Sequence, residues 1–183
     1  MFDPLNPEAF TLLDGNIDDY RTLQRFHYRA RRPATWCRVV AARFAWPGRA
    51  APVTVAVGVL SWPTACSRGR QRAFAMNGWT YGEQLLFANA NIRTISRVIV
   101  HPTFRSLGLS TRIIRRLIEL CPTRYVEAAA VMGRAHPLFE KAGMTRFDPT
   151  GDRDPVYYLF DKSPPNPAAE ARGSDPECGM NSG

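Results

Sequence analysis

The positions of apolar residues along the chain predict a sheet. Residues 38–44 (RVVAARF) and 53–62 (VTVAVGVLSW) are apolar runs rich in β-branched residues, and the Pro- and Gly-containing turn between them indicates a hairpin. Further runs of this kind predict strands at 91–100, 124–130, 145–148 and 156–161. These six runs are the expected strands.

Helical spacing of apolar residues predicts the helices. In 16–27 the repeating positions are Ile17, Tyr20, Leu23 and His27, and Asn16 or Asp18 could cap the start. After residue 108, one face of the expected helix carries Leu109, Ile113, Ile114, Leu117 and Leu120, and the opposite face is mostly Arg. A short helix is expected at 136–143, with Pro137 in its first turn and Gly143 as its C-terminal cap.

Residues 63–90 show no clean period, and we expect an irregular loop there, either functional or partly mobile. The last residues, 162–183, are rich in Pro, Gly and Ala with almost no large apolar side chain. Such a composition predicts a disordered tail. The length then suits one domain over 1–161.

The four cysteines are far apart and form no CxxC pair, which argues against a zinc ribbon or a disulfide scaffold. No cluster of metal ligands stands out, so we assign no metal. The chain starts without the basic and apolar segments of a signal peptide, and no apolar run is long enough to span a membrane. We therefore expect a cytoplasmic protein with no membrane partner.

The distribution of charge favours a polyanionic partner. The net charge is +8, and residues 20–82 contain eleven arginines and no acidic residue. A long positive stretch attracts phosphate-bearing molecules such as DNA or RNA. A preference of the genome for arginine codons is the alternative explanation of the many arginines.

The turn HPTFRSLGLS joins the strand that ends at Val100 to the helix that begins near Gly108. The first amides of a helix have no helical partners and lie at the positive end of its dipole, which suits a phosphate. Gly108 would let the phosphate approach the backbone, and Arg105 could add a charged contact. The alternative is a plain joint in which Gly108 only eases a bend.

Two motifs resemble the GNAT acetyltransferase superfamily. VIVHPTFRSLGLS is similar to its strand followed by Arg/Gln-x-x-Gly-x-Gly/Ala, with Ser110 where Gly or Ala is usual, and LFEKAGM is similar to its later F-Y/F-x-K-x-G-F segment. The resemblance covers about residues 91–147. It implies an α/β (α+β) GNAT fold, in which helices flank a mixed central sheet whose strands 91–100 and 124–130 splay apart.

The resemblance also implies acetyl-CoA as the donor of an acyl group. The pantetheine arm would follow the strand edge at Val98, Ile99 and Val100, and the pyrophosphate would bind the turn. The implied turn residues are Arg105, Ser106, Leu107, Gly108, Leu109 and Ser110. The reaction would be attack of an amine on the thioester, with a backbone amide stabilising the oxyanion.

The sequence departs from the family where the acid and base usually stand. The strand before the turn has Ser96 but no Glu, and Phe139 occupies the usual Tyr position. The candidate catalytic residues are His27, Tyr28, Ser96 and Glu127. His27 could instead be a cap or a core residue, and Glu127 could merely face solvent. His101 is expected to be structural and His136 to cap the short helix.

The chain is similar, more loosely, to a GNAT branch that includes the phage Mom DNA-modification proteins and GNAT-like domains linked to ABC-type ATPases. The similarity rests on HYR followed by Pro, on GVLSWP and on SRVIVHPTFR. It implies a nucleic-acid amine as acceptor, with His27 and Tyr28 on the acceptor side. Expected nucleic-acid contacts are Arg29, Arg31, Arg32, Arg68, Arg70 and Arg72.

Arginines interleaved with aromatics suit phosphate contacts with base stacking. In the alternative interpretation, Trp36 and Trp62 belong to the core and the arginines form a solvated face. Two other functions remain open: transfer to a small-molecule or protein amine, and a binding module without catalysis. The sequence does not indicate an oligomeric state.

Overall fold

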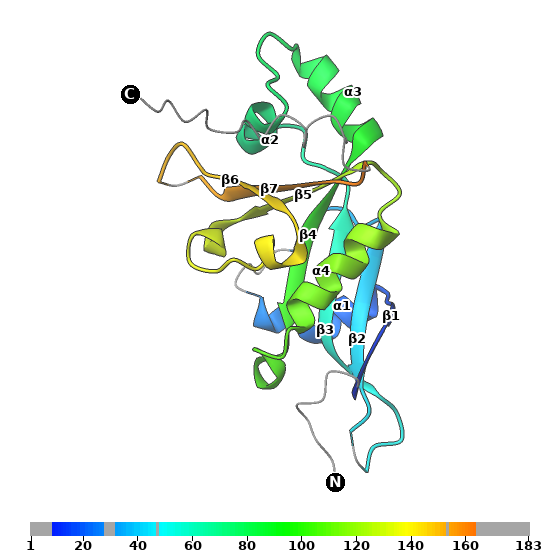
Figure 1. Cartoon of the computed structure of the whole chain (residues 1–183). Coiled ribbons are helices and arrows are strands. Elements are labelled where there is room, and N and C mark those ends of the chain that lie inside the picture. Colours follow the sequence, from blue (N-terminus) through cyan, green and yellow to red (C-terminus); the bar gives the residue numbers. More distant parts are fainter. Residues whose placement is uncertain (1–8, 28–31, 47, 153, 164–183) are drawn as a thin grey trace, which may run out of the picture.

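A computed structural model describes residues 9–27, 32–46, 48–152 and 154–163, and arranges them around one seven-stranded sheet (Figure 1). The strands lie in the order β1-β2-β3-β4-β5-β7-β6. Their bounds are β1 Phe10–Asp14, β2 Arg38–Phe44, β3 Val53–Ser61, β4 Ile92–Val100, β5 Tyr125–Ala130, β6 Thr145–Phe147 and β7 Val156–Asp161. Neighbouring strands are antiparallel except for β4 and β5, which are parallel, so the sheet is mixed as expected.

Helices cover both faces of this sheet. The α-helices are α1 Ile17–Leu23, α2 Arg68–Ala73, α3 Tyr81–Asn91 and α4 Leu109–Leu120. Single 3₁₀ turns are η2 Gln24–Phe26, η3 Pro102–Phe104, η4 Val131–Arg134 and η5 Glu140–Ala142. Figure 1 shows α4 lying across the sheet and α3 projecting at the end where β4 begins.

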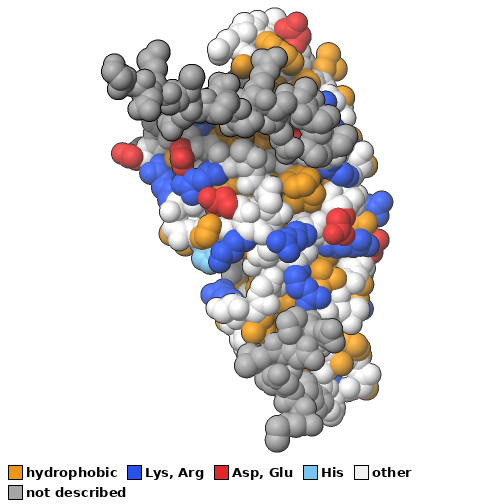
Figure 2. All heavy atoms as spheres, in the orientation of Figure 1, with side chains coloured by type: hydrophobic (Ala, Val, Ile, Leu, Met, Phe, Trp, Pro, Cys, Tyr) orange, Lys and Arg blue, Asp and Glu red, His pale blue; other side chains and the backbone are white. Residues whose placement is uncertain are grey.

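The core consists of two apolar clusters on opposite faces of the sheet. The larger contains the inner face of α4 together with Val40, Leu60 and Ile95. The smaller packs Tyr20 and Leu23 of α1 against the alternate side chains of β2 and β3. The outer face of α4 carries Arg112, Arg115 and Arg116, and basic side chains are spread over this face in Figure 2.

The two central strands separate after a short paired stretch. β4 and β5 pair at three positions, of which Thr94 with Glu127 is the last. Beyond it β4 continues to Val100 along β3, whereas β5 pairs with β7. The sequence prediction of splayed central strands is confirmed, and the separation opens a wedge.

A β-bulge lies at the point where the wedge begins. Along β3 the partners change from Val59 with Arg97 to Leu60 with Ile95, so Ser96 is the extra residue on β4. A bulge bends its strand and increases the local twist. It therefore helps to direct β4 away from β5.

The fold differs from the sequence prediction in three places. The short strand β1 was not predicted, and residues 63–90 contain α2 and α3 instead of an irregular loop. Residues 136–143 form turns and the single 3₁₀ turn η5 instead of a helix, although Gly143 ends it in the left-handed conformation (φ +96°). The predicted tail falls almost wholly outside the described residues.

No helix in the described part of the chain combines the length and apolarity that a membrane span requires. Cys37, Cys66 and Cys121 are free thiols.

Candidate active site in the wedge between β4 and β5

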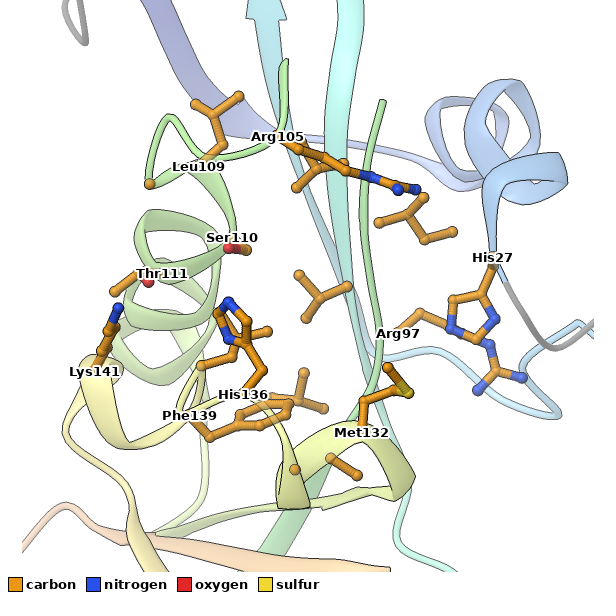
Figure 3. A pocket seen from close by; sticks show the side chains of 18 of the residues that line it. His27, Arg97, Arg105, Leu109, Ser110, Thr111, Met132, His136, Phe139 and Lys141 are labelled. Carbon is orange, nitrogen blue, oxygen red and sulfur yellow. The ribbon is translucent and has the colours of Figure 1, made fainter. Parts of the chain in front are cut away.

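The wedge contains a cavity of about 870 Å³. Its walls come from four parts of the chain: the free stretch of β4, the turn into α4 with the start of that helix, the end of β5 with the segment that follows, and the end of η2. Figure 3 shows labelled side chains that line it. A cavity of this volume lies within the range of small-molecule and cofactor sites.

The turn into α4 has the backbone of an anion-binding loop. Ser106 and Gly108 both adopt the left-handed conformation, with φ of +67° and +73°. Gly108 is the N-cap of α4 and offers no side-chain hydrogen bond to the helix. In α1 and α3, by contrast, Asn16 and Thr80 form complete capping boxes. The first amides of α4 are therefore left open to a ligand.

The charges around this turn favour an anion. Arg112 N donates to Gly108 O at 3.1 Å, so the amides of residues 109–111 precede the helical hydrogen-bond ladder at the positive end of a twelve-residue helix. The side chains of Arg105 and Lys141 line the same cavity. These residues could bind the two phosphates of a diphosphate.

The free edge of β4 offers backbone hydrogen bonds along the cavity. His101 N donates to Val55 O on β3 at 2.8 Å. Because amides alternate in direction along a strand, Val98 N and Val100 N face the opposite edge, where β5 has separated. An extended amide-containing ligand could pair with this edge like an added strand.

The far end of the cavity is formed by His27, Ser96 and Arg97. Figure 3 shows His27 and Arg97 on one side of the strand that carries Arg97, and His136, Ser110 and Lys141 on the other. Ser96 Oγ lies 2.6 Å from Ser61 Oγ and 3.3 Å from Val59 O. Of the predicted catalytic residues, the structure thus brings His27 and Ser96 to the cavity, whereas Tyr28 lies outside the described residues.

Glu127 is placed differently from both of its predicted environments. It is buried, with 3% of its surface exposed, and it does not line the cavity. Its carboxylate accepts hydrogen bonds from Arg70 Nε (2.9 Å) and Nη2 (2.6 Å), Thr94 Oγ1 (2.6 Å) and Tyr157 Oη (2.8 Å). With four donors on its two oxygens, the carboxylate is fully engaged and is not placed to act as the base.

The electrostatics of this network follow from burial and from the ion pair. Burial alone would lower the pKa of Arg70, but its hydrogen bonds and charge interaction with Glu127 raise it overall. Burial and the adjacent Glu127 carboxylate raise the pKa of Tyr157, which stays a neutral donor. The prediction of Arg70 as a nucleic-acid contact is therefore wrong, because only 2% of its surface is exposed.

The other predicted nucleic-acid contacts divide into two groups. Arg29 and Arg31 lie outside the described residues. Arg32 is exposed, Arg68 is 80% exposed with Asp154 3.6 Å away, and Arg72 donates to Asp148 O at 2.9 Å. None of these three lines the cavity.

Sequence reasoning missed three basic side chains that line the cavity: Arg97, His136 and Lys141. A signal existed for Lys141, which is the lysine of the LFEKAGM motif. His136 was predicted to cap a helix that does not form, and its side chain instead points into the cavity (Figure 3). The position of Arg97 depends on the bulge at Ser96, which no pattern in the sequence indicates.

Comparison with known proteins identifies the fold. Residues 66–144 match the model of the acetyltransferase (GNAT) family. NAA60 from Arabidopsis thaliana, solved in complex with acetyl-CoA, is 13% identical, with 83% of this chain and 97% of that chain covered and a TM-score of 0.53. The aminoglycoside acetyltransferase AAC(6')-Ib in complex with coenzyme A is 17% identical, with 84% and 95% covered and a TM-score of 0.50.

At these identities the solved structures establish the fold. Among curated proteins, no sequence relative was found. The family match begins two residues before α2 and ends at the residue before β6, so it includes the open turn, α4 and both splayed strands. The chain therefore has a GNAT fold and contains, over residues 66–144, a segment that matches the acetyltransferase (GNAT) family.

Proposed function

We propose that this chain transfers the acetyl group of acetyl-CoA to an amino group of a nucleic acid. Acetyl-CoA-dependent N-acetyltransfer is the activity of the GNAT family, whose model matches residues 66–144. The nucleic-acid acceptor is the finer part of the proposal. The observation that carries it is the basic far end of the cavity, where Arg97 and His27 lie together across β4 from the start of α4.

The donor would bind along the wedge. Its pyrophosphate would accept hydrogen bonds from the open amides at the start of α4, and Arg105 and Lys141 would add positive charge. Its pantetheine amides would pair with the Val98 and Val100 positions of β4. This arrangement would bring the thioester to the bulge at Ser96, next to the far end of the cavity.

The chemistry requires an oxyanion donor and a proton acceptor. Attack of the amine on the thioester carbonyl places negative charge on the carbonyl oxygen, which a free N–H of β4 would stabilise. The amine nitrogen must then lose a proton, and the sulfur must gain one as the C–S bond breaks. Among the described residues that line the cavity, none is a carboxylate. His27 is the candidate for the proton acceptor because it lies on the acceptor side.

The charge of the far end discriminates between acceptors. A guanidinium beside the reacting amine repels polycationic amines and attracts acceptors that carry phosphate. Residues 20–82, which supply His27 and the segments around it, contain no acidic side chain to offset this charge. An amino group within a nucleic acid meets both conditions.

The test is nucleoside mass spectrometry on DNA and RNA from cells that express the protein. Gly108→Glu serves as the inactive variant, because it puts bulk and negative charge at the turn. Gly78→Glu is the matched control, because both glycines have a left-handed φ (+82° and +73°), a Cβ at either meets no atom within 4 Å, and Gly78 does not line the cavity.

We expect a heavier nucleoside with the wild type and Gly78→Glu, and none with Gly108→Glu. An unmodified nucleoside profile, together with acetyl-CoA turnover on small-molecule or peptide amines, would overturn the nucleic-acid acceptor. Loss of coenzyme A binding in Gly108→Glu, measured by calorimetry, tests the donor site separately.

A further inference from the structure

Two exposed tryptophans lie next to the acceptor end of the cavity. Trp36 and Trp62 are 48% and 47% exposed, so the interpretation that places them in the core is wrong. Hydrogen bonds hold their segments side by side: Cys37 N donates to Leu60 O at 2.6 Å and Trp62 N to Thr35 Oγ1 at 3.2 Å. The indoles therefore stand on adjoining segments.

The same segments connect directly to the cavity wall. Ser61, which precedes Trp62, donates to Thr35 O at 2.5 Å and lies 2.6 Å from Ser96 Oγ. Ser96 lines the cavity at the bulge of β4. A molecule bound across the two indoles would thus lie beside the acceptor end.

The indole of Trp62 is held in a fixed orientation. The guanidinium of Arg93 lies over its ring, 3.7 Å from the ring centroid. Arg93 is itself restrained, because its Nη1 donates to Asn89 O at 2.9 Å and to Ile92 O at 2.7 Å. The result is a half-exposed aromatic surface supported from below by a cation, which favours stacking with a planar π-system.

The charge around the two indoles is positive. Arg32 is exposed on the same segment as Trp36, and Arg93 lies beneath Trp62. Near Trp36, Asp14 lies 3.7 Å from Arg38, which offsets its charge. A partner that combines planar rings with negative charge fits this surface.

We infer that Trp36 and Trp62 form a stacking surface for unpaired bases of the nucleic acid whose amino group is acetylated. The inference rests on the proposed function, and it assigns the partner's form: a single strand, or a base displaced from a duplex, held beside the acceptor end. Stacking of this kind depends little on sequence because every base has a π-face.

The test is binding of the full chain to a fluorescent single-stranded 12-mer of mixed sequence, in DNA and RNA versions, against an abasic 12-mer of equal length. The variants are Trp36→Ala and Trp62→Ala. Trp46→Ala is the matched control, because Trp46 is 45% exposed but packs on Phe44 and Phe104 at the other end of β2 and β3. Coenzyme A affinity is measured on every variant to show that the fold is retained.

We expect the wild type and Trp46→Ala to prefer the base-containing strand, and each of the other variants to lose about 5- to 150-fold in affinity for it. Affinity for the abasic strand should stay unchanged. Equal binding of the two strands by the wild type, equal losses for all three variants, or no binding would each overturn the inference. If modified nucleosides form but the base-containing and abasic strands bind equally well, only the stacking surface is refuted. If the base-containing strand is preferred but no modified nucleoside forms, only the proposed function is refuted.

Discussion

Replacing Glu127 by Gln removes one charge of the buried ion pair with Arg70 while keeping the size of the side chain. The two side chains are only 2% and 4% exposed, and two N–H groups of Arg70 point at the two carboxylate oxygens. After the substitution, a guanidinium remains buried opposite a neutral amide. Such an uncompensated buried charge costs about 3–5 kcal/mol of the free energy of unfolding.

The chain offers a control with the same geometry and different burial. Arg124 Nε and Nη2 donate to the two oxygens of Asp161 at 3.0 and 2.9 Å, but these side chains are 53% and 41% exposed. Water screens such a pair, so its contribution to stability is small. Arg124→Gln should therefore lower stability several times less than Glu127→Gln, although each removes one charge from a two-point ion pair.

Thermal unfolding followed by circular dichroism measures both variants. For a chain of this size, 1 kcal/mol corresponds to about 2–4 °C, so Glu127→Gln should lower Tm by about 6–20 °C. Arg70→Met should cost a similar amount, and the double variant much less than the sum of the two. Additive losses, or a loss in Glu127→Gln no larger than in Arg124→Gln, would refute the role that we give to burial.

Three further substitutions test other parts of the structure. Gly108→Ala should lower the free energy of unfolding by about 1–2 kcal/mol, because φ of Gly108 is +73°. The added Cβ would meet no atom within 4 Å, so this cost comes from the backbone conformation alone. An unchanged Tm would contradict the left-handed turn. His27→Ala should keep the affinity for coenzyme A but slow acetyl transfer, measured as the rate at which the free thiol of coenzyme A is released. An unchanged transfer rate would make His27 a structural residue. The hydrogen bond from Arg124 lowers the pKa of Asp161 to about 2, so its contribution to stability is present above pH 4 and is lost as the pH falls toward 2. The free energies of unfolding of the wild type and Asp161→Asn, measured with urea, should therefore converge in acid. A difference that stays constant from pH 7 to 2 would contradict this.

The sequence was sufficient where one local pattern decides the structure. The strands at 38–44 and 156–161 were predicted with the bounds that the structure gives, because continuous apolar runs end there at turn residues. The helix α4 was predicted because its apolar residues occupy one face and its arginines the other. The turn before it was predicted from Arg105 and Gly108, whose spacing matches the family motif.

Residues 63–90 were missed because their helices bury few side chains. Ala88 is the buried residue of α3, whereas Leu86 is 73% exposed, so no apolar face is visible in the sequence. The readable signal was at the start, where Thr80 and Glu83 form a capping box. β1 was missed for another reason: five residues gain their strand conformation only by pairing with β2.

Two charged side chains, Arg70 and Glu127, lie in a different environment from the one that the sequence predicted, because they are buried and paired with each other. Arg70 and Glu127 are 57 residues apart, and pairing at that separation leaves no periodic signal. A carboxylate between Val126 and Ala128 in an apolar strand was nevertheless informative. Because a buried charge must be paired, such a residue predicts a buried cation elsewhere in the chain.

That buried pair links the segment between β3 and β4 to the active site. Thr94 and Glu127 are the last paired residues of β4 and β5, and they are also hydrogen-bonded through their side chains. Arg70 connects α2 to this point through its hydrogen bonds with Glu127. Gly69 of α2 packs closely on Tyr157 of β7, because a Cβ on Gly69 would lie 2.4 Å from the Tyr157 side chain. The position at which the wedge opens is therefore set by four separate elements: α2, β4, β5 and β7. Because the cavity begins one residue beyond Thr94, substitutions in α2 should alter how the donor sits even though α2 does not line the cavity.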